Sequence, residues 1–155
     1  MLFVFLQNEQ QSPVVQPETR QPVDYEHALL LQIDKVLLLL QTVRKDLRAF
    51  LKEVNATDKP KEVIDVFRSQ LESHAGQLRQ CEETLSLLKP PQEATSELHS
   101  KLLVGLIKYR RAVETYAEGL AAYDFNVVKQ SQLELEQADS EIHLAVERIT
   151  SNFAK

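Results

Sequence analysis

Apolar residues recur at alternating spacings of three and four along four long stretches of this sequence. In the first stretch they step by 4-3-4-3-4-3-4 through Leu29, Ile33, Val36, Leu40, Val43, Leu47, Phe50 and Val54. An α-helix completes a turn about every 3.6 residues, so this spacing places all of these side chains on one face of a helix. The pattern predicts long amphipathic helices, each with one face in a core.

Residues that stop or start helices separate the four stretches. Asp24 can accept hydrogen bonds from the first free amides of a helix, and Pro60 suits a first turn, where its missing amide costs least. Pro90 and Pro91 interrupt the periodicity, and Asp124 can cap the last helix. We therefore predict helices over about residues 25–55, 60–89, 91–123 and 125–153, with Pro91 opening the third.

Four helices of similar length joined by short connections favour an antiparallel up-down-up-down four-helix bundle. The 155 residues suffice for one domain with a buried core, and the absence of tryptophan and the presence of only three glycines suit an all-α fold. The same apolar spacing also fits a pair of helical hairpins that complete their core by dimerising. We favour a monomer, with a homodimer as the alternative.

The amino-terminal residues 1–23 differ in composition from the rest of the chain. The apolar run MLFVFL at residues 1–6 is shorter than the roughly 20 residues that span a bilayer, and a spacer rich in glutamine and proline follows it. We predict that residues 1–23 form a disordered leader of a cytoplasmic protein or, in an extracytoplasmic protein, a membrane tether whose anchor lies upstream. The helical domain is expected over residues 24–155.

The charge and the cysteine content restrict the classes of partner and site. A net charge of −5 repels a phosphate backbone, so we expect no binding to nucleic acid. The single cysteine, Cys81, cannot form an internal disulfide and shares a predicted apolar face with Leu78 and Leu85. It is predicted to be a small buried hydrophobic residue and not a reactive thiol.

No constellation of residues predicts catalysis or a bound cofactor. One histidine falls in each predicted helix, at His27, His74, His99 and His143, but the Glu-x-x-His motif of di-iron bundles does not occur. The three glycines lie inside helical patterns, where they cannot form a phosphate-binding loop. We therefore expect no metal, no cofactor and no enzymatic activity, and only His74, which lies on an apolar face, is expected to need a buried partner.

Basic residues near the end of the first helix and the start of the second form a candidate interaction surface. They are Arg44, Lys45, Arg48, Lys52, Lys59 and Lys61. Cations near a helix carboxyl end complement its dipole, and they could also contact an anionic partner. In the third helix, Lys108, Arg110 and Arg111 are expected to pair with the acidic fourth helix.

Small and aromatic residues alternate on one face of the predicted third helix, at Gly105, Tyr109, Ala112, Tyr116 and Gly119. A glycine inside a helix costs roughly 0.5–1 kcal/mol relative to alanine, so two on one face predict that something large approaches closely. We expect Phe50, Phe67 or a tyrosine ring to fill these notches, with a bound ligand as the alternative.

The second half of the chain carries a recurrent set of residues. They are Pro91, Leu98, His99, Leu102, Leu103, Tyr109, Ala112, Tyr116, Gly119, Asp124, Ala138 and Ile142. Through these residues, the segment 91–149 resembles bacterial extracytoplasmic helical proteins that have no assigned activity. The resemblance implies a membrane-tethered or secreted bundle with a proline- or glutamine-rich spacer, although Cys81 does not match the lipidation cysteine of a lipoprotein.

Three functions remain open at this point. A non-enzymatic bundle that binds or scaffolds another protein is favoured, because the chain offers long helical surfaces and no positioned nucleophile or ligand set. The second is a bundle that binds an apolar small ligand between its helices. The third is a metal-binding bundle.

Overall fold

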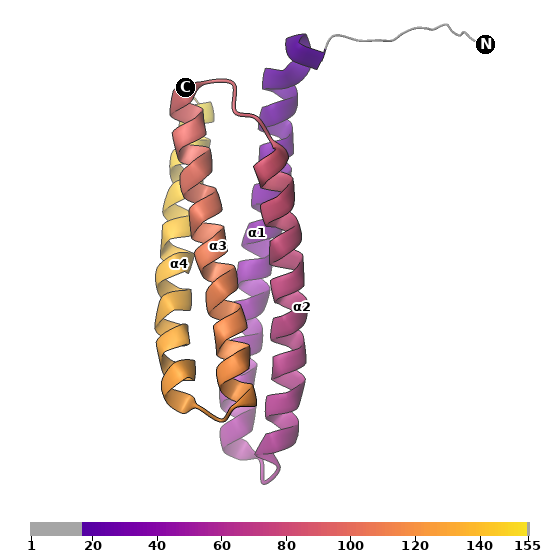
Figure 1. The fold of residues 1–155 in the computed structure, drawn as a ribbon, viewed down its shortest axis with the longest axis vertical. Helices are drawn as coiled ribbons and strands as arrows, with labels where there is room; N and C mark the ends of the chain where they lie inside the picture. The colour runs from indigo at the N-terminus through magenta and orange to yellow at the C-terminus, as the bar shows by residue number, and fades with distance from the viewer. Residues whose placement is uncertain (1–16, 155) are drawn as a thin grey trace, which may run out of the picture.

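The computed structural model describes residues 17–154 and shows four helices that run alternately up and down (Figure 1). The helices are α1 Pro17–Ala56, α2 Pro60–Leu87, α3 Glu93–Ala121 and α4 Phe125–Phe153. The predicted all-α, four-helix bundle is confirmed. Most of the predicted leader or tether lies at residues 1–16, outside the described residues.

Two helix boundaries differ from the prediction. α1 begins at Pro17, so Asp24 lies inside the helix and not at its start. Pro91 does not open α3, which instead starts at Glu93 after Gln92 at the capping position. A proline disfavours the helical conformation of the residue before it, so Pro90 and Pro91 together keep the α2–α3 connection extended over a longer stretch than we predicted.

Two predicted helix starts are confirmed. Pro60 lies in the first turn of α2, where its missing amide has no intrahelical partner to lose. The side chain of Asp124 accepts a hydrogen bond from the backbone amide of Val127 at 3.3 Å and caps α4. The amino ends of α2 and α4 are therefore fixed by the residues that the sequence indicated.

All four helices contribute to one core within a single copy of the chain. In its lower part, the ring of Phe50 from α1 stacks on Phe67 from α2 at 4.4 Å, and Phe67 meets the edge of Tyr116 from α3 at 5.8 Å. Cys81 is buried, as predicted, and burial raises the pKa of its thiol. The periodic faces of the sequence are therefore the faces that pack together.

The glycines of α3 allow α4 to pack closely against it. A Cβ atom added at Gly105 would lie 3.1 Å from Ile142 Cγ1, and one added at Gly119 would lie 2.9 Å from Val128 Cγ2. The notches are therefore filled by aliphatic side chains of α4. Our expectation that Phe50, Phe67 or a tyrosine ring would fill them is wrong, because α3 turns its small residues toward α4 and its tyrosines toward the centre of the bundle.

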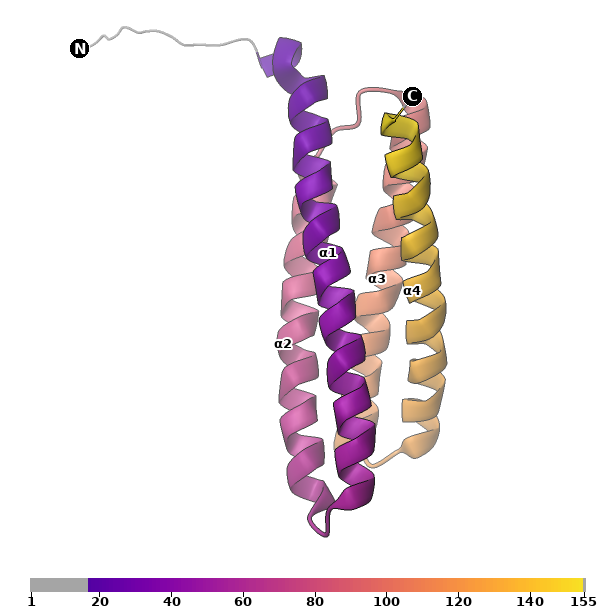
Figure 2. The same cartoon turned by 180° about the vertical axis from the view of Figure 1, so that it is seen from behind.

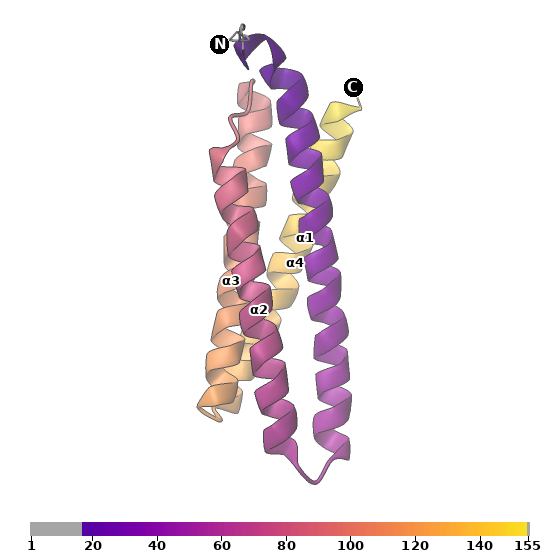
Figure 3. The same cartoon turned by 90° about the vertical axis from the view of Figure 1, so that its right-hand side faces the viewer.

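The α1–α4 pair is the most loosely packed of the neighbouring helix pairs. α1 and α4 approach each other at only a few positions, whereas α3 and α4 touch along their length. Figure 2 looks onto α1 and α4 and shows α3 behind the space between them. From the side, the α1–α2 loop extends beyond the α3–α4 loop at the same end of the bundle (Figure 3).

The turn between α3 and α4 contains Tyr123 with a φ angle of 54°. The amides of Tyr123 and Asp124 donate to the carbonyls of Leu120 and Gly119, at 3.2 and 2.9 Å, which is the Schellman arrangement. The left-handed position of this motif usually holds glycine, because other residues pay roughly 1 kcal/mol there. The side chain of Tyr123 is half exposed, so it regains little of this energy by burial.

We expect Tyr123→Gly to stabilise the protein by up to about 1 kcal/mol, because glycine adopts a positive φ without steric cost. Urea denaturation of the variant and the parent measures the difference. Ala122→Gly is the matched control: Ala122 has an ordinary φ of −88°, so its replacement should give no gain. A destabilised Tyr123→Gly variant would show that the exposed ring contributes more than the strain costs.

His99 links three helices through a buried hydrogen-bond chain. The hydroxyl of Tyr25 in α1 donates to His99 Nδ1 at 2.8 Å, and His99 Nε2 donates to the carbonyl of Leu85 in α2 at 2.8 Å. Both rings are buried and stacked at 5.8 Å. Burial lowers the pKa of His99 below its usual value and raises the pKa of Tyr25 to about 12, so both groups are neutral at pH 7.

We expect the free energy of unfolding to fall as the pH is lowered from about 7 to 5. The unfolded chain binds a proton at His99 near pH 6.5, whereas the folded chain binds it only at a lower pH, so protonation favours unfolding in this window. Urea denaturation across this range measures the slope. His99→Gln keeps one donor and one acceptor but does not titrate, so it should flatten the slope. An equal slope in the variant would assign the effect to other groups.

Candidate functional site

A groove of about 220 Å³ lies between α1 and α4. Its walls are mostly apolar: Leu47 and Leu51 come from α1, Leu135 comes from α4, and Tyr109 of α3 forms the floor. The remaining lining residues are Val43, Arg44, Arg48, Gln132, Glu136 and Asp139. Because α1 and α4 are loosely packed, Leu51 is left 39% exposed and Leu47 is only partly buried.

A short polar chain crosses the groove. Arg44 of α1 forms an ion pair with Asp139 of α4. His143 Nδ1, one turn further along α4, contacts the other oxygen of the same carboxylate at 2.7 Å. Asp139 and Arg44 also act on Tyr109 through their charges, but burial is the main reason that the pKa of its hydroxyl is raised. The Arg44–Asp139 ion pair joins the two walls at one level and leaves the rest of the groove open.

The structure divides the predicted basic surface. Arg44 and Arg48 line the groove, and Lys45 and Lys52 are exposed on the same part of α1. Lys59 lies in the α1–α2 loop, and Lys61 lies in the first turn of α2, where it pairs with Asp65 at 2.9 Å. This pairing raises the pKa of Lys61 and lowers that of Asp65. Only the α1 residues therefore belong to one surface.

The predicted ligand notch is part of the core. Gly105, Tyr109, Ala112, Tyr116 and Gly119 are all buried, and α4 fills the space beside both glycines. Burial raises the pKa of Tyr116 to about 12. Of these residues, Tyr109 forms the floor of the groove between α1 and α4, and Ala112 borders a separate groove between α3 and α4.

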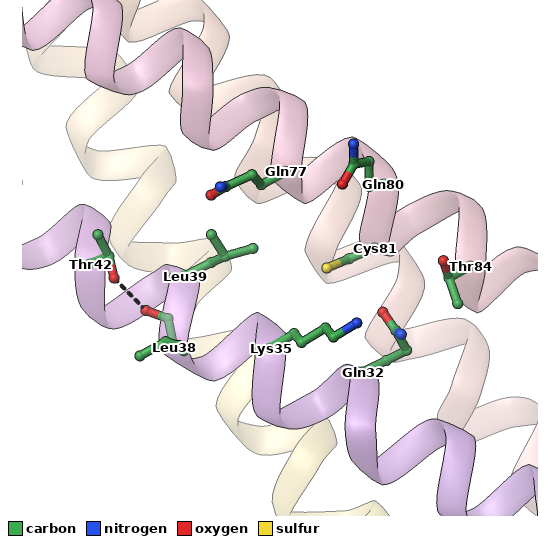
Figure 4. Close-up of a pocket in the computed structure, with 9 residues that line it drawn as sticks. All are labelled: Gln32, Lys35, Leu38, Leu39, Thr42, Gln77, Gln80, Cys81 and Thr84. Atoms are coloured by element: carbon green, nitrogen blue, oxygen red, sulfur yellow. Dashed lines mark hydrogen bonds between the residues drawn. The ribbon is translucent and has the colours of Figure 1, made fainter.

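Two other grooves, one between α1 and α2 and one between α2 and α3, have a different lining. The groove between α1 and α2, of about 410 Å³, is lined by uncharged polar side chains around Leu39 and Cys81, with Lys35 as its charged residue (Figure 4). The groove between α2 and α3 is lined by small and charged residues and crossed by the Arg79–Glu114 ion pair at 2.8 Å. In the α1–α2 groove Lys35 is the single charged residue, and in the α2–α3 groove cations and carboxylates occur together.

The four histidines do not assemble a site. His74 Nε2 donates to Asp46 of α1 at 2.7 Å, so the buried partner expected for His74 is present. His99 is held by Tyr25 and Leu85, and His143 contacts Asp139. Within the described part of the chain, no three metal-ligating side chains come together. Nor does any helix there combine the length and the apolar character of a bilayer span.

Sequence reasoning missed the α4 side of the groove. Asp139 and Leu135 look in the sequence like an ordinary charged residue and an ordinary core residue, and Arg44 and Asp139 are 95 residues apart. The only available signal was the basic stripe at Arg44 and Arg48, one turn apart on α1. Comparison with family models, curated proteins and solved structures yields no match.

Proposed function

We propose that this protein is a non-enzymatic helical-bundle module that binds another protein along the α1–α4 groove. The observation that carries this proposal is the loose α1–α4 packing, which leaves Leu47 and Leu51 partly exposed between two long helices. Partly exposed apolar side chains rimmed by polar residues are typical of interaction sites. The groove thus offers a partner an apolar surface that is already formed.

Size favours a protein over a small molecule. Pockets for drug-sized ligands usually occupy about 300–1,000 Å³ and enclose most of the ligand, whereas this groove has about 220 Å³ and is open along its length. It accommodates one or two large side chains of a partner. The glycine face of α3, which was the alternative place for an apolar ligand, is packed by Ile142 and Val128.

Site-specific photo-crosslinking in the cell that produces the protein tests this proposal. A photoreactive amino acid at Gln132 or Leu51 places the probe in the groove, and the same residue at Gln70 or Ser73 places it on the exposed face of α2 as a matched control. We expect a discrete protein adduct from the groove positions and none from α2. Equal adducts from both faces, or none from either, would contradict the proposal.

A further inference from the structure

The charge around the groove is uneven. Arg44 is paired with Asp139, but Lys45, Arg48 and Lys52 form no ion pair with any carboxylate in the part of the chain that the structure describes. These cations lie on the α1 side of the groove, in a protein whose net charge is −5. On the α4 side, the groove is lined by the carboxylates of Glu136 and Asp139, and Asp139 already pairs with Arg44. The α1 side of the groove therefore carries more positive charge than the carboxylates of the α4 side can neutralise.

We propose that the occupant of the groove is an amphipathic helix of a partner protein whose apolar stripe is flanked by carboxylates on the side that faces α1. This inference rests on the proposed function and specifies the chemistry of the partner. Side chains spaced by three or four on such a helix enter the groove between Leu51 and Leu135, while its carboxylates meet Arg48 and Lys52.

A helix fits this groove better than an extended peptide. An extended peptide gains its affinity by pairing with a free sheet edge, but residues 17–154 contain no strand. Two antiparallel helices instead present rows of side chains at helical spacing, into which a third helix packs by ridges and grooves. Of the neighbouring pairs, α1 and α4 are the two helices whose backbones approach each other at the fewest positions, so their facing rows of side chains interlock least.

Two synthetic three-heptad peptides with the same leucine stripe test the inference, one flanked by glutamates and one by lysines. Fluorescence anisotropy with the full chain should show binding of the glutamate peptide, weakened by salt, and little binding of the lysine peptide. Arg48→Glu combined with Lys52→Glu should weaken binding of the glutamate peptide by about tenfold. Lys89→Glu together with Lys101→Glu changes the net charge equally, away from the groove, and should leave binding unchanged.

Each other result overturns the inference in a recognisable way. Equal binding of both peptides would show that charge does not select the partner. Binding of neither peptide, together with groove-specific crosslinks, would leave the proposed function standing and exclude a helix of this kind. A concentration-dependent dimer in sedimentation experiments, lost on Arg48→Glu, would identify the occupant as a second copy of this chain.

Discussion

Replacing Arg110 with methionine should destabilise the bundle by about 3 kcal/mol in urea denaturation, because it leaves a carboxylate buried without its partner. Arg110 Nε and Nη2 donate to the two oxygens of Glu82 at 2.6 and 3.0 Å, and both side chains are nearly nine-tenths buried between α2 and α3. The hydrogen bonds to Glu82 are the main reason that the pKa of Arg110 is raised. In Arg110→Met, the Glu82 carboxyl would stay in a site with little access to water and would lose both of its Arg110 hydrogen-bond donors.

The complementary variants separate desolvation from attraction. Glu82→Leu should cost less than Arg110→Met, because Arg110 retains a second partner, Glu114, at 2.9 Å. The double variant should recover most of the loss and fall within about 1 kcal/mol of the parent, since two apolar side chains of similar volume avoid the cost of burying charge. Losses below about 0.5 kcal/mol in both single variants would show that this pair behaves like an exposed ion pair.

Arg110 also marks the limit of what the sequence predicts. Its position beside Lys108 on a helix followed by an acidic helix suggested that both would pair with α4. Lys108 does, with Glu141 at 3.2 Å, but Arg110 pairs with Glu82 on α2. Long side chains reach either neighbour, and a modest rotation of α3 about its axis decides between them. Apolar periodicity defines which face of α3 points inward. It does not define the rotation of α3 closely enough to decide whether Arg110 pairs with α2 or with α4.

The same distinction applies to the candidate groove. The inward faces of all four helices were predictable, because each apolar step of three or four residues restricts a side chain to one side of a helix. The loose α1–α4 packing was not predictable, because it depends on the distances between helices that are far apart in the sequence. The seams of α1 and α4 are as regular as those of α2 and α3, although Gly105 and Gly119 draw α4 toward α3.

The glycines of α3 should respond to substitution in an order set by what lies beside each of them. At Gly119, a new Cβ would meet Val128 Cγ2 at 2.9 Å, Val127 Cγ1 at 3.0 Å and the backbone nitrogen of Val128 at 3.2 Å. A backbone atom cannot move aside as a side chain can. We therefore expect Gly119→Leu to destabilise by about 3 kcal/mol and Gly105→Leu by about 2 kcal/mol, because both overpack the α3–α4 contact.

Alanine substitutions at these two glycines and at Gly76 of α2 provide the control on helix propensity. Alanine is favoured over glycine in a helix by roughly 0.5–1 kcal/mol, so Gly76→Ala, whose new Cβ would have no atom within 4 Å, should stabilise by about that amount. At Gly105 this gain is offset by the 3.1 Å approach to Ile142 Cγ1, and at Gly119 the closer contacts should outweigh it. Urea denaturation of the five variants tests this order. A Gly119→Leu variant as stable as the parent would mean that the first turns of α4 can move away from α3, and that the close contact between these two helices is not what holds α4 in place.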